Sequence, residues 1–525
     1  AGSATAHLPL VTCDFISNGV QAASLAGSSD QPKRRPDLNG RNHVNAQRLM
    51  LSNPFSIPVM TRPLLLKTVS LLALLALLLV GLHEGGCAQV VMTAHALKTK
   101  LTRTGPDYDE LEEHRGRAVI PAEDVGALLG DSAADATWTA YRGNRGDGVY
   151  SAQPLLDSWP DQGPACLWRQ PIGGGYASFA VAAGRAVTIE QRRAMEAVVA
   201  YDVATGRELW AHEYPARFTE PLGGEGPRAT PLIAHAMARP LVVALGATGH
   251  LTCLDLASGS SVWHRNVLED AAAGNLTYGL TASPILVDGQ VIVLTGAPGS
   301  PQLVHAFRID DGEPIWSALS DDGSYATPMH ARLAGRDQLI VASASRVVGL
   351  DASDGALLWD FPWSVMVGLT LSQPIVIESR RVLLSGGYGK GSVLIEIEAS
   401  DGAFEAREVW RSIRLKAKFN SPVAHNGHAY GLDEGTLVCL DLETGERLWK
   451  GGRFGYGQTL LAGERLIVVS ESGELALVAV TPDGYDELCR FQAISGTTWN
   501  NPAFASGKLL IRNAVEMACF DLRQP

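Results

Sequence analysis

Short apolar runs recur along most of the chain, and each is apolar at consecutive positions rather than at every second one. Examples are VIVLTG (291–296), LIVASA (339–344) and LIVVSE (466–471). Continuous apolar runs of this length, bounded by turn residues, predict strands that are buried on both faces. The pattern therefore predicts an all-β protein in which sheets stack against one another.

A polar turn and a tryptophan follow many of these runs. The segment LVCLDLETGERLWK (437–450) has near-copies in YDVATGRELW (201–210) and CLDLASGSSVW (253–263). The turn glycines of all such units lie about 40 to 50 residues apart, a period typical of propeller blades; they are Gly206, Gly259, Gly312, Gly355, Gly402, Gly445 and Gly484. Glycine supplies the left-handed backbone of the turn, and the aspartate four residues earlier is expected to hold the corner.

A second repeated element gives the number of blades. It occurs at eight places, which are YAS (176–178), RATP (228–231), TASP (281–284), YATP (325–328), LSQP (371–374), FNSP (419–422), YGQT (456–459) and WNNP (499–502). The last unit ends at CFDLRQP without an outer strand, whereas ACLWRQPI around Trp168 has no blade of its own. The sequence therefore predicts an eight-bladed β-propeller closed by an N-terminal strand near Trp168.

The repeated tryptophan is predicted to be structural, because its place after the turn is fixed in each unit. It ends an outer strand and is expected to pack on the neighbouring blade; the residues are Trp168, Trp210, Trp263, Trp316, Trp359 and Trp449. Cys253, Cys439 and Cys519 share one repeat position and are predicted to be small buried hydrophobes rather than disulfide partners.

The front of the chain has a different composition. Residues 60–88 combine a basic start, an uncharged apolar run and small residues before Gln89, which predicts a signal peptide or an N-terminal membrane anchor. The polar segment 1–59 precedes it and predicts a disordered or spurious upstream piece, with Met60 as the start. Residues 89–137 are expected to be a linker with a short helix near 108–115, and residues 138–525 the propeller. Export to the periplasm or cell envelope follows, with membrane attachment only through the N-terminal segment.

The net negative charge of the chain argues against one class of binding partner. The chain carries a formal charge of -12 and its pI is about 5.6. A duplex nucleic-acid binder needs a basic face, so the charge argues against that class. No cysteine or histidine motif predicts a metal site.

The unit [L/V]xxLDxxTGxxxW, followed by an SP-type strand, resembles the PQQ-like repeat, and the resemblance covers about 138–525. That family includes quinoprotein alcohol dehydrogenases and the lipoprotein of the outer-membrane β-barrel assembly machinery. For the dehydrogenases the resemblance implies pyrroloquinoline quinone (PQQ) in the channel over a tryptophan, with calcium, an aspartate base and often a disulfide between adjacent cysteines. No two cysteines are adjacent here, and no motif places the calcium ligands or the base.

The residues that precede the innermost strands are predicted to surround one mouth of the channel, together with the loops between second and third strands. The candidate binding residues are Tyr176, Glu190, Gln191, Arg228, Tyr325, Gln373, Lys418, Asn420, Tyr456, Gln458, Trp499 and Asn500, with Tyr388 and Lys390 on a nearby loop. Aromatic and basic side chains suit an anionic or planar ligand. The alternative is that the mouth is polar because water fills it.

Two functions follow from these observations. The first is a non-catalytic binding or scaffold protein of the cell envelope, with a protein partner or small ligand at the loop face and no cofactor. The alternative is a PQQ- and calcium-dependent oxidoreductase of alcohols or sugars.

Overall fold

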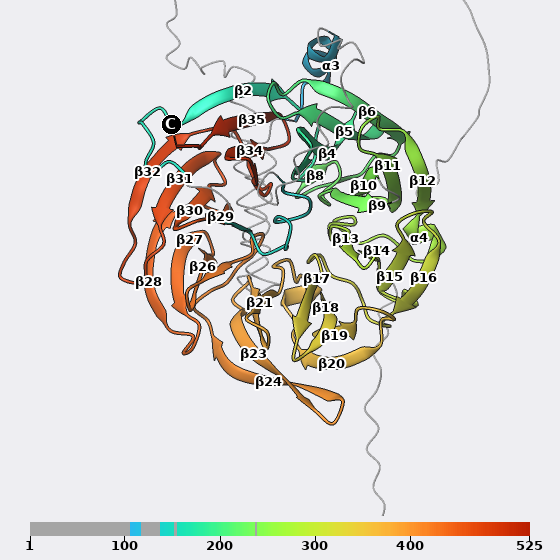
Figure 1. Ribbon diagram of the computed structural model, residues 1–525, viewed down its shortest axis with the longest axis vertical. Helices are drawn as coiled ribbons and strands as arrows, with labels where there is room; N and C mark the ends of the chain where they lie inside the picture. The colour runs from blue at the N-terminus through green and yellow to red at the C-terminus, as the bar shows by residue number, and fades with distance from the viewer. Residues whose placement is uncertain (1–104, 117–136, 152–154, 237–238, 525) are drawn as a thin grey trace, which may run out of the picture. The chain divides into compact units, whose positions relative to one another are not determined.

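Eight antiparallel sheets form a ring, which confirms the predicted eight-bladed β-propeller (Figure 1). The computed structural model describes residues 105–116, 137–151, 155–236 and 239–524. All of them belong to one compact unit of the chain, Ala76–Pro525. The predicted upstream piece 1–59, the predicted signal or anchor 60–88 and most of the predicted linker lie outside the described residues.

In each blade the chain runs from the innermost strand to the rim. The first four blades are β3 (Ala180–Ala182), β4 (Arg185–Arg192), β5 (Met195–Asp202) and β6 (Glu208–Pro215); β9 (Leu232–Ala236), β10 (Arg239–Leu245), β11 (His250–Asp255) and β12 (Ser261–Asn266); β13 (Ile285–Val287), β14 (Gln290–Leu294), β15 (Val304–Arg308) and β16 (Pro314–Ala318); and β17 (Met329–Leu333), β18 (Arg336–Ala342), β19 (Arg346–Asp351) and β20 (Leu357–Pro362).

The remaining blades continue around the ring. Blade 5 is β21 (Ile375–Ile377), β22 (Arg381–Gly386), β23 (Gly391–Ser400) and β24 (Ala403–Ser412); blade 6 is β25 (Val423–His425), β26 (His428–Asp433), β27 (Thr436–Asp441) and β28 (Arg447–Arg453); blade 7 is β29 (Gln458–Ala462), β30 (Arg465–Val469), β31 (Glu474–Ala479) and β32 (Glu487–Gln492); blade 8 is β33 (Ala503–Ala505), β34 (Lys508–Arg512), β35 (Glu516–Asp521) and β2 (Ala165–Pro171). The smaller elements are β1 (Val149–Tyr150), β7 (Thr219–Glu220), β8 (Gly224–Glu225), α3 (Tyr108–Gly116), α4 (Val267–Asp270) and η3 (Met366–Gly368).

The N-terminal strand β2 closes the ring as predicted. It pairs antiparallel with β35, so that Trp168 lies opposite Cys519. The last blade therefore takes three strands from the C-terminal end of the propeller and its outer strand from the start. Cys253, Cys439 and Cys519 lie fully buried in the third strands of their blades, in agreement with the prediction.

The repeated tryptophan joins one blade to the next. The indole of Trp263 in blade 2 lies over Gly312 in the turn of blade 3, and its Nε1 donates to the carbonyl of Ile309 at 2.7 Å. A Cβ on Gly312 would lie 2.7 Å from the ring. The same packing pairs Trp168 with Gly206, Trp210 with Gly259, Trp316 with Gly355, and Trp410 with Gly445. These turn positions therefore require glycine for two reasons: the backbone has a positive φ, and the indole leaves no room for a Cβ.

The junction between blades 4 and 5 is built differently. Trp359 donates to Gln338 Oε1 at 2.6 Å within its own blade and covers Gly349. Gly402 has no atom within 4 Å of an added Cβ. The reason is that β23 and β24 are longer than their counterparts, so their turn lies farther along the hairpin, which protrudes from the ring in Figure 1.

The helix α3 falls where a short helix was expected. Its Tyr108 hydroxyl donates to Glu225 Oε1 at 2.8 Å, and Arg115 forms an ion pair with Glu208 at 3.0 Å. These contacts attach it to blade 1 and to the β7–β8 loop. Neither it nor any other helix in the described part of the chain has the length and apolar character needed to cross a membrane.

Substituting two turn glycines separates the two reasons for glycine. Gly312→Ala and Gly402→Ala both place a side chain at positive φ, 74° and 81°, which costs about 1–2 kcal/mol. Only Gly312→Ala also displaces an indole, which we expect to cost about 1–3 kcal/mol more. Urea unfolding should therefore give a lower midpoint for Gly312→Ala than for Gly402→Ala; equal midpoints would contradict the interlock.

Candidate functional site

The centre of the ring is crossed by the chain itself, in a segment that we call the plug (residues 138–150) (Figure 1). Trp138 exchanges two backbone hydrogen bonds of 2.8 Å with Val181 in blade 1. Thr139 accepts from Ile233 in blade 2 at 2.7 Å. On the other side, β1 pairs in parallel with β29 inside blade 7. The plug therefore bonds to innermost strands across the channel.

Arg142 fixes the middle of the plug. Its guanidinium is almost fully buried and donates to the carbonyls of Ser421 and Pro422 at 2.7 Å each, and to the carbonyl of Asp147 at 2.9 Å. Among the described residues no carboxylate forms an ion pair with it, and backbone carbonyls accept from its two terminal nitrogens. Burial lowers the pKa of Arg142, but a guanidinium stays protonated at neutral pH. The positive φ of Arg142, 58°, shows how tightly the segment turns around this group.

The hydroxyl of the SP-type motif links neighbouring blades. The backbone N–H of Ser178 donates to Thr230 Oγ1 at 3.1 Å, that of Thr230 to Ser283 Oγ at 2.9 Å, and that of Ser283 to Thr327 Oγ1 at 2.9 Å. The relay connects the starts of the innermost strands from blade 1 to blade 4. It explains why a hydroxyl residue precedes the strand in these blades.

Four candidate binding residues belong to this inner ring rather than to the open mouth. Gln373, Asn420, Gln458 and Asn500 are each at most 2% exposed. Gln458 donates to the carbonyls of Phe419 and Trp499 at 2.9 and 2.8 Å, and Asn500 to that of Ala177 at 2.9 Å. The amides of Gln458 and Asn500 therefore tie successive blades together, whereas the amide of Asn420 has no hydrogen-bond partner among the described residues.

Buried and half-buried aromatic rings surround the mouth, and we call them the aromatic belt; they are Phe218, Tyr176, Trp499, Phe419, Tyr456, Tyr388, Tyr278 and Tyr325. Tyr325 is the most buried of them, at 9% exposed. Neighbouring ring centroids lie 5.4 Å apart for Tyr176 and Trp499, 5.5 Å for Trp499 and Phe419, and 5.3 Å for Phe419 and Tyr456. The structure thus brings the predicted Tyr176, Tyr456 and Trp499 together.

In the described part of the chain, Arg228 and Lys418 are the cations of the belt, and of these two only Arg228 has an ion pair there. Arg228 stacks over Phe218 and forms an ion pair of 2.9 Å with Glu220. Lys418 instead lies among aromatic rings, and burial lowers its pKa. Burial also raises the pKa of Tyr388 to about 12 and that of Tyr456, so these phenols are neutral at pH 7.

Glu190 and Gln191 lie elsewhere than the sequence analysis expected. Both are fully buried at the end of β4. Glu190 pairs with Arg192 at 2.6 Å, and Gln191 donates to the carbonyls of Met195 and Ala216 at 2.8 Å. Both side chains are therefore closed to a ligand from solvent, and Gln191 Oε1 instead accepts from the backbone N–H of Phe218 at 3.4 Å.

Sequence reasoning missed several members of the belt. Phe218 and Tyr278 lie in connections between blades, where no repeat position marks them, whereas Phe419 begins the repeated element FNSP and could have been selected. Glu471 was missed too, although its carboxylate accepts from Trp499 Nε1 at 3.0 Å and from the Tyr456 N–H at 3.3 Å. The aromatic residue that begins several of the SP-type elements was a signal for Phe419 alone.

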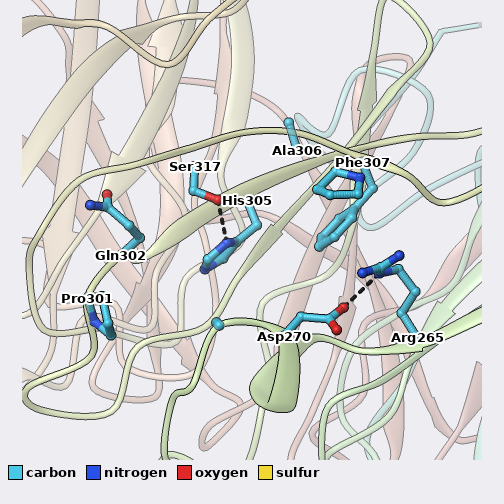
Figure 2. A pocket seen from close by; sticks show the side chains of 10 residues that line it. Arg265, Asp270, Pro301, Gln302, His305, Ala306, Phe307 and Ser317 are labelled. Carbon is cyan, nitrogen blue, oxygen red and sulfur yellow. Dashed lines mark hydrogen bonds and ion pairs between the residues drawn. The ribbon is translucent and has the colours of Figure 1, made fainter.

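A pocket of about 310 Å³ lies on the rim between blades 2 and 3 (Figure 2). Arg265 pairs with Asp270 at 2.7 Å on one side, and His305 bonds to Ser317 Oγ at 2.9 Å on the other. His305 and Ser317 are also register partners of β15 and β16. These polar groups pair with one another within the fold, so the mouth remains the stronger candidate site.

Comparison with known proteins gives two kinds of relative. The model of a family described as outer membrane protein assembly factor BamB matches residues 194–451. BamB of Yersinia pestis is 27% identical over 162 residues, which cover 28% of this chain and 38% of that protein. The chain thus matches little more than a third of the length of this curated relative.

The fold is also similar to solved quinoproteins. Quinohemoprotein alcohol dehydrogenase of Comamonas testosteroni superposes with a TM-score of 0.52 at 12% identity, over 79% of this chain and 85% of the other. The enzyme ADHIIG of Pseudomonas putida HK5 gives 0.53 at 15% identity, over 77% and 83%. At these identities the likeness concerns the fold alone.

The buried hydrogen bonds of Arg142 predict that two arginine substitutions in the plug differ strongly in their effect on the free energy of unfolding. Arg142→Met removes the donors of two buried carbonyls, so we expect the free energy of unfolding to fall by about 2–4 kcal/mol. Arg145→Met is the matched control, because Arg145 has 64% of its side chain exposed and should change stability by less than about 0.5 kcal/mol. Chemical unfolding measures both; similar losses would contradict the role of Arg142.

Proposed function

We propose that this chain, a β-propeller of the PQQ-like repeat family, is a non-catalytic scaffold of the bacterial cell envelope that docks a protein partner on its mouth face. The observation that carries the proposal is the plug, because the chain's own residues occupy the centre of the ring. The similarity to proteins named as outer membrane assembly factors supports the same class of function and an exported location.

The chemistry of the channel also favours a scaffold over a quinoprotein oxidoreductase. PQQ and calcium would need carboxylate and amide oxygens that converge on a hard cation. Within the described ranges, no group of three or more His, Cys, Asp or Glu side chains is arranged to hold a metal ion. Gln458 and Asn500 donate their amide N–H groups between blades, whereas their amide oxygens accept no hydrogen bond from the described residues and have no cluster of carboxylates beside them. The donor set therefore fits the cofactor poorly.

The mouth face has the composition of a protein-binding surface. Tyrosine and tryptophan dominate binding hot spots, since they bury a large area with few rotatable bonds and keep a polar atom. The belt presents Tyr176, Trp499 and Tyr456 side by side, each half-buried and therefore rigid. A rigid ring that offers such a belt is suited to hold a partner without a chemical step.

A cofactor titration tests the scaffold against the enzyme. The full chain is titrated with PQQ and calcium and followed by quinone absorbance, and then assayed for dye-linked oxidation of alcohols and sugars. We expect no saturable binding at micromolar PQQ and no turnover. Saturable binding with turnover would instead identify a quinoprotein dehydrogenase.

Photo-crosslinking tests the docking face. A photoreactive phenylalanine analogue replaces Tyr456 at the mouth. As a control it replaces Lys508, which begins β34 after the β33–β34 turn, at the other end of the innermost strand from the mouth. Both variants are made in cells that naturally produce the protein. We expect a discrete protein adduct from position 456 that Trp499→Ala suppresses. Equal adducts from both positions would place the partner elsewhere.

A further inference from the structure

Lys418 lies at the point of the mouth where three rings converge. Its Nζ is 4.3 Å from the centroid of Tyr456, 4.6 Å from that of Tyr388 and 5.1 Å from that of Phe419. The rings come from the β22–β23 loop and from the connections that lead into blades 6 and 7. A cation so placed is held by the π faces of its neighbours.

Its electrostatic surroundings differ from those of nearby lysines. Lys416 and Lys450 both form ion pairs of 2.5 Å with Asp433. For Lys418, no carboxylate oxygen of the described residues lies within 4.0 Å, and no hydrogen-bond acceptor is found for its Nζ among them. Its three cation–π neighbours reduce its contact with water without neutralising its charge.

The acidic groups nearest to it are otherwise engaged. Glu471 acts on Lys418 only at longer range, because its two oxygens accept from Trp499 Nε1 and from the Tyr456 N–H. Glu434 is exposed to solvent. The centre of the belt therefore holds a positive charge for which the described part of the chain supplies no direct counter-ion.

We propose that Lys418 receives the carboxylate of an acidic side chain on the docked partner, while an adjacent aromatic residue of that partner packs on Trp499 and Phe419. This inference rests on the proposed docking function and names the chemistry of the partner at that face. The carboxylate would complete the coordination of Lys418, and the rings beside it would cover the partner's apolar side chain.

The arrangement favours one carboxylate over a phosphate group. A phosphate is usually bound by several donors, such as a planar guanidinium or a cluster of backbone N–H groups. The guanidinium of the mouth, Arg228, is already used by Glu220 and by the carbonyls of Gly226 and Gly224. Lys418 thus offers a single cation in an apolar frame, which suits a Glu or Asp flanked by aromatic residues.

A matched pair of peptides tests the inference by isothermal titration calorimetry with the full chain. The probes are acetyl-Gly-Phe-Glu-Phe-Gly-amide and its counterpart with Gln in place of Glu. We expect saturable binding of the Glu peptide and about tenfold weaker binding of the Gln peptide, because a charge-assisted contact is lost. Lys418→Gln should abolish the difference in affinity between the two peptides. Lys508→Gln removes the same charge at the start of β34, away from the mouth, and should leave that difference unchanged.

The inference is overturned if both peptides bind equally, if neither binds, or if Lys418→Gln retains the preference for Glu. None of these results affects the docking function itself when position 456 still crosslinks a partner in a Trp499-dependent manner. Loss of that crosslink would instead remove the proposed function, whatever the peptides do.

Discussion

The guanidinium of Arg142 is the interaction on which the centre of this propeller depends. A buried cation is tolerated only where oxygen atoms surround it, and here the carbonyls of Ser421, Pro422 and Asp147 do so. The first two belong to the connection into blade 6, and the third belongs to the plug. One side chain thus anchors the segment that bonds to blades 1, 2 and 7 across the ring.

Around this centre, the blades are joined at two radii. Near the channel, hydroxyl groups such as those of Thr230 and Ser283 accept backbone hydrogen bonds from the preceding blade. Near the rim, indoles lie on turn glycines, as Trp263 does on Gly312. Neither device is present between blades 4 and 5, and the indole–glycine packing is also absent between blades 6 and 7, where no atom lies within 4 Å of a Cβ added to Gly484. Gln373 replaces the hydroxyl residue in blade 5, and Trp359 turns back to Gln338 in blade 4. The long β23–β24 hairpin accompanies the irregular junction between blades 4 and 5.

The sequence was sufficient for the fold because each blade repeats the same local signals. The turn glycine, the tryptophan and the SP-type element recur in the same order in most blades, so the number of blades and the closing strand around Trp168 could be predicted. The irregular junction could not, since a longer hairpin changes where the turn lies without changing the motif. Trp410 was missed for the same reason: its turn at Gly402 lies next to a longer strand.

The candidate site was predictable only in part. Position in the repeat identified Tyr176, Lys418, Tyr456 and Trp499, which lie at the mouth. The same rule also selected Gln458 and Asn500, whose amides bond between blades, and it placed Glu190 in a loop although it ends a buried strand. Repeat position does not tell which way a side chain points. Nor did it show that residues 138–150 would return through the channel, because that segment has no repeat.

The most direct test of this account is amide hydrogen exchange of the intact protein, resolved for the plug. If the plug is an integral part of the ring, the amides of Val181, Gly148 and Ile233 should exchange as slowly as those in the middle strands of the blades, by global opening. Rapid exchange at these positions, with the middle strands still protected, would mean that the plug leaves the channel readily. The centre of the ring would then be open to a ligand, contrary to the scaffold proposed here.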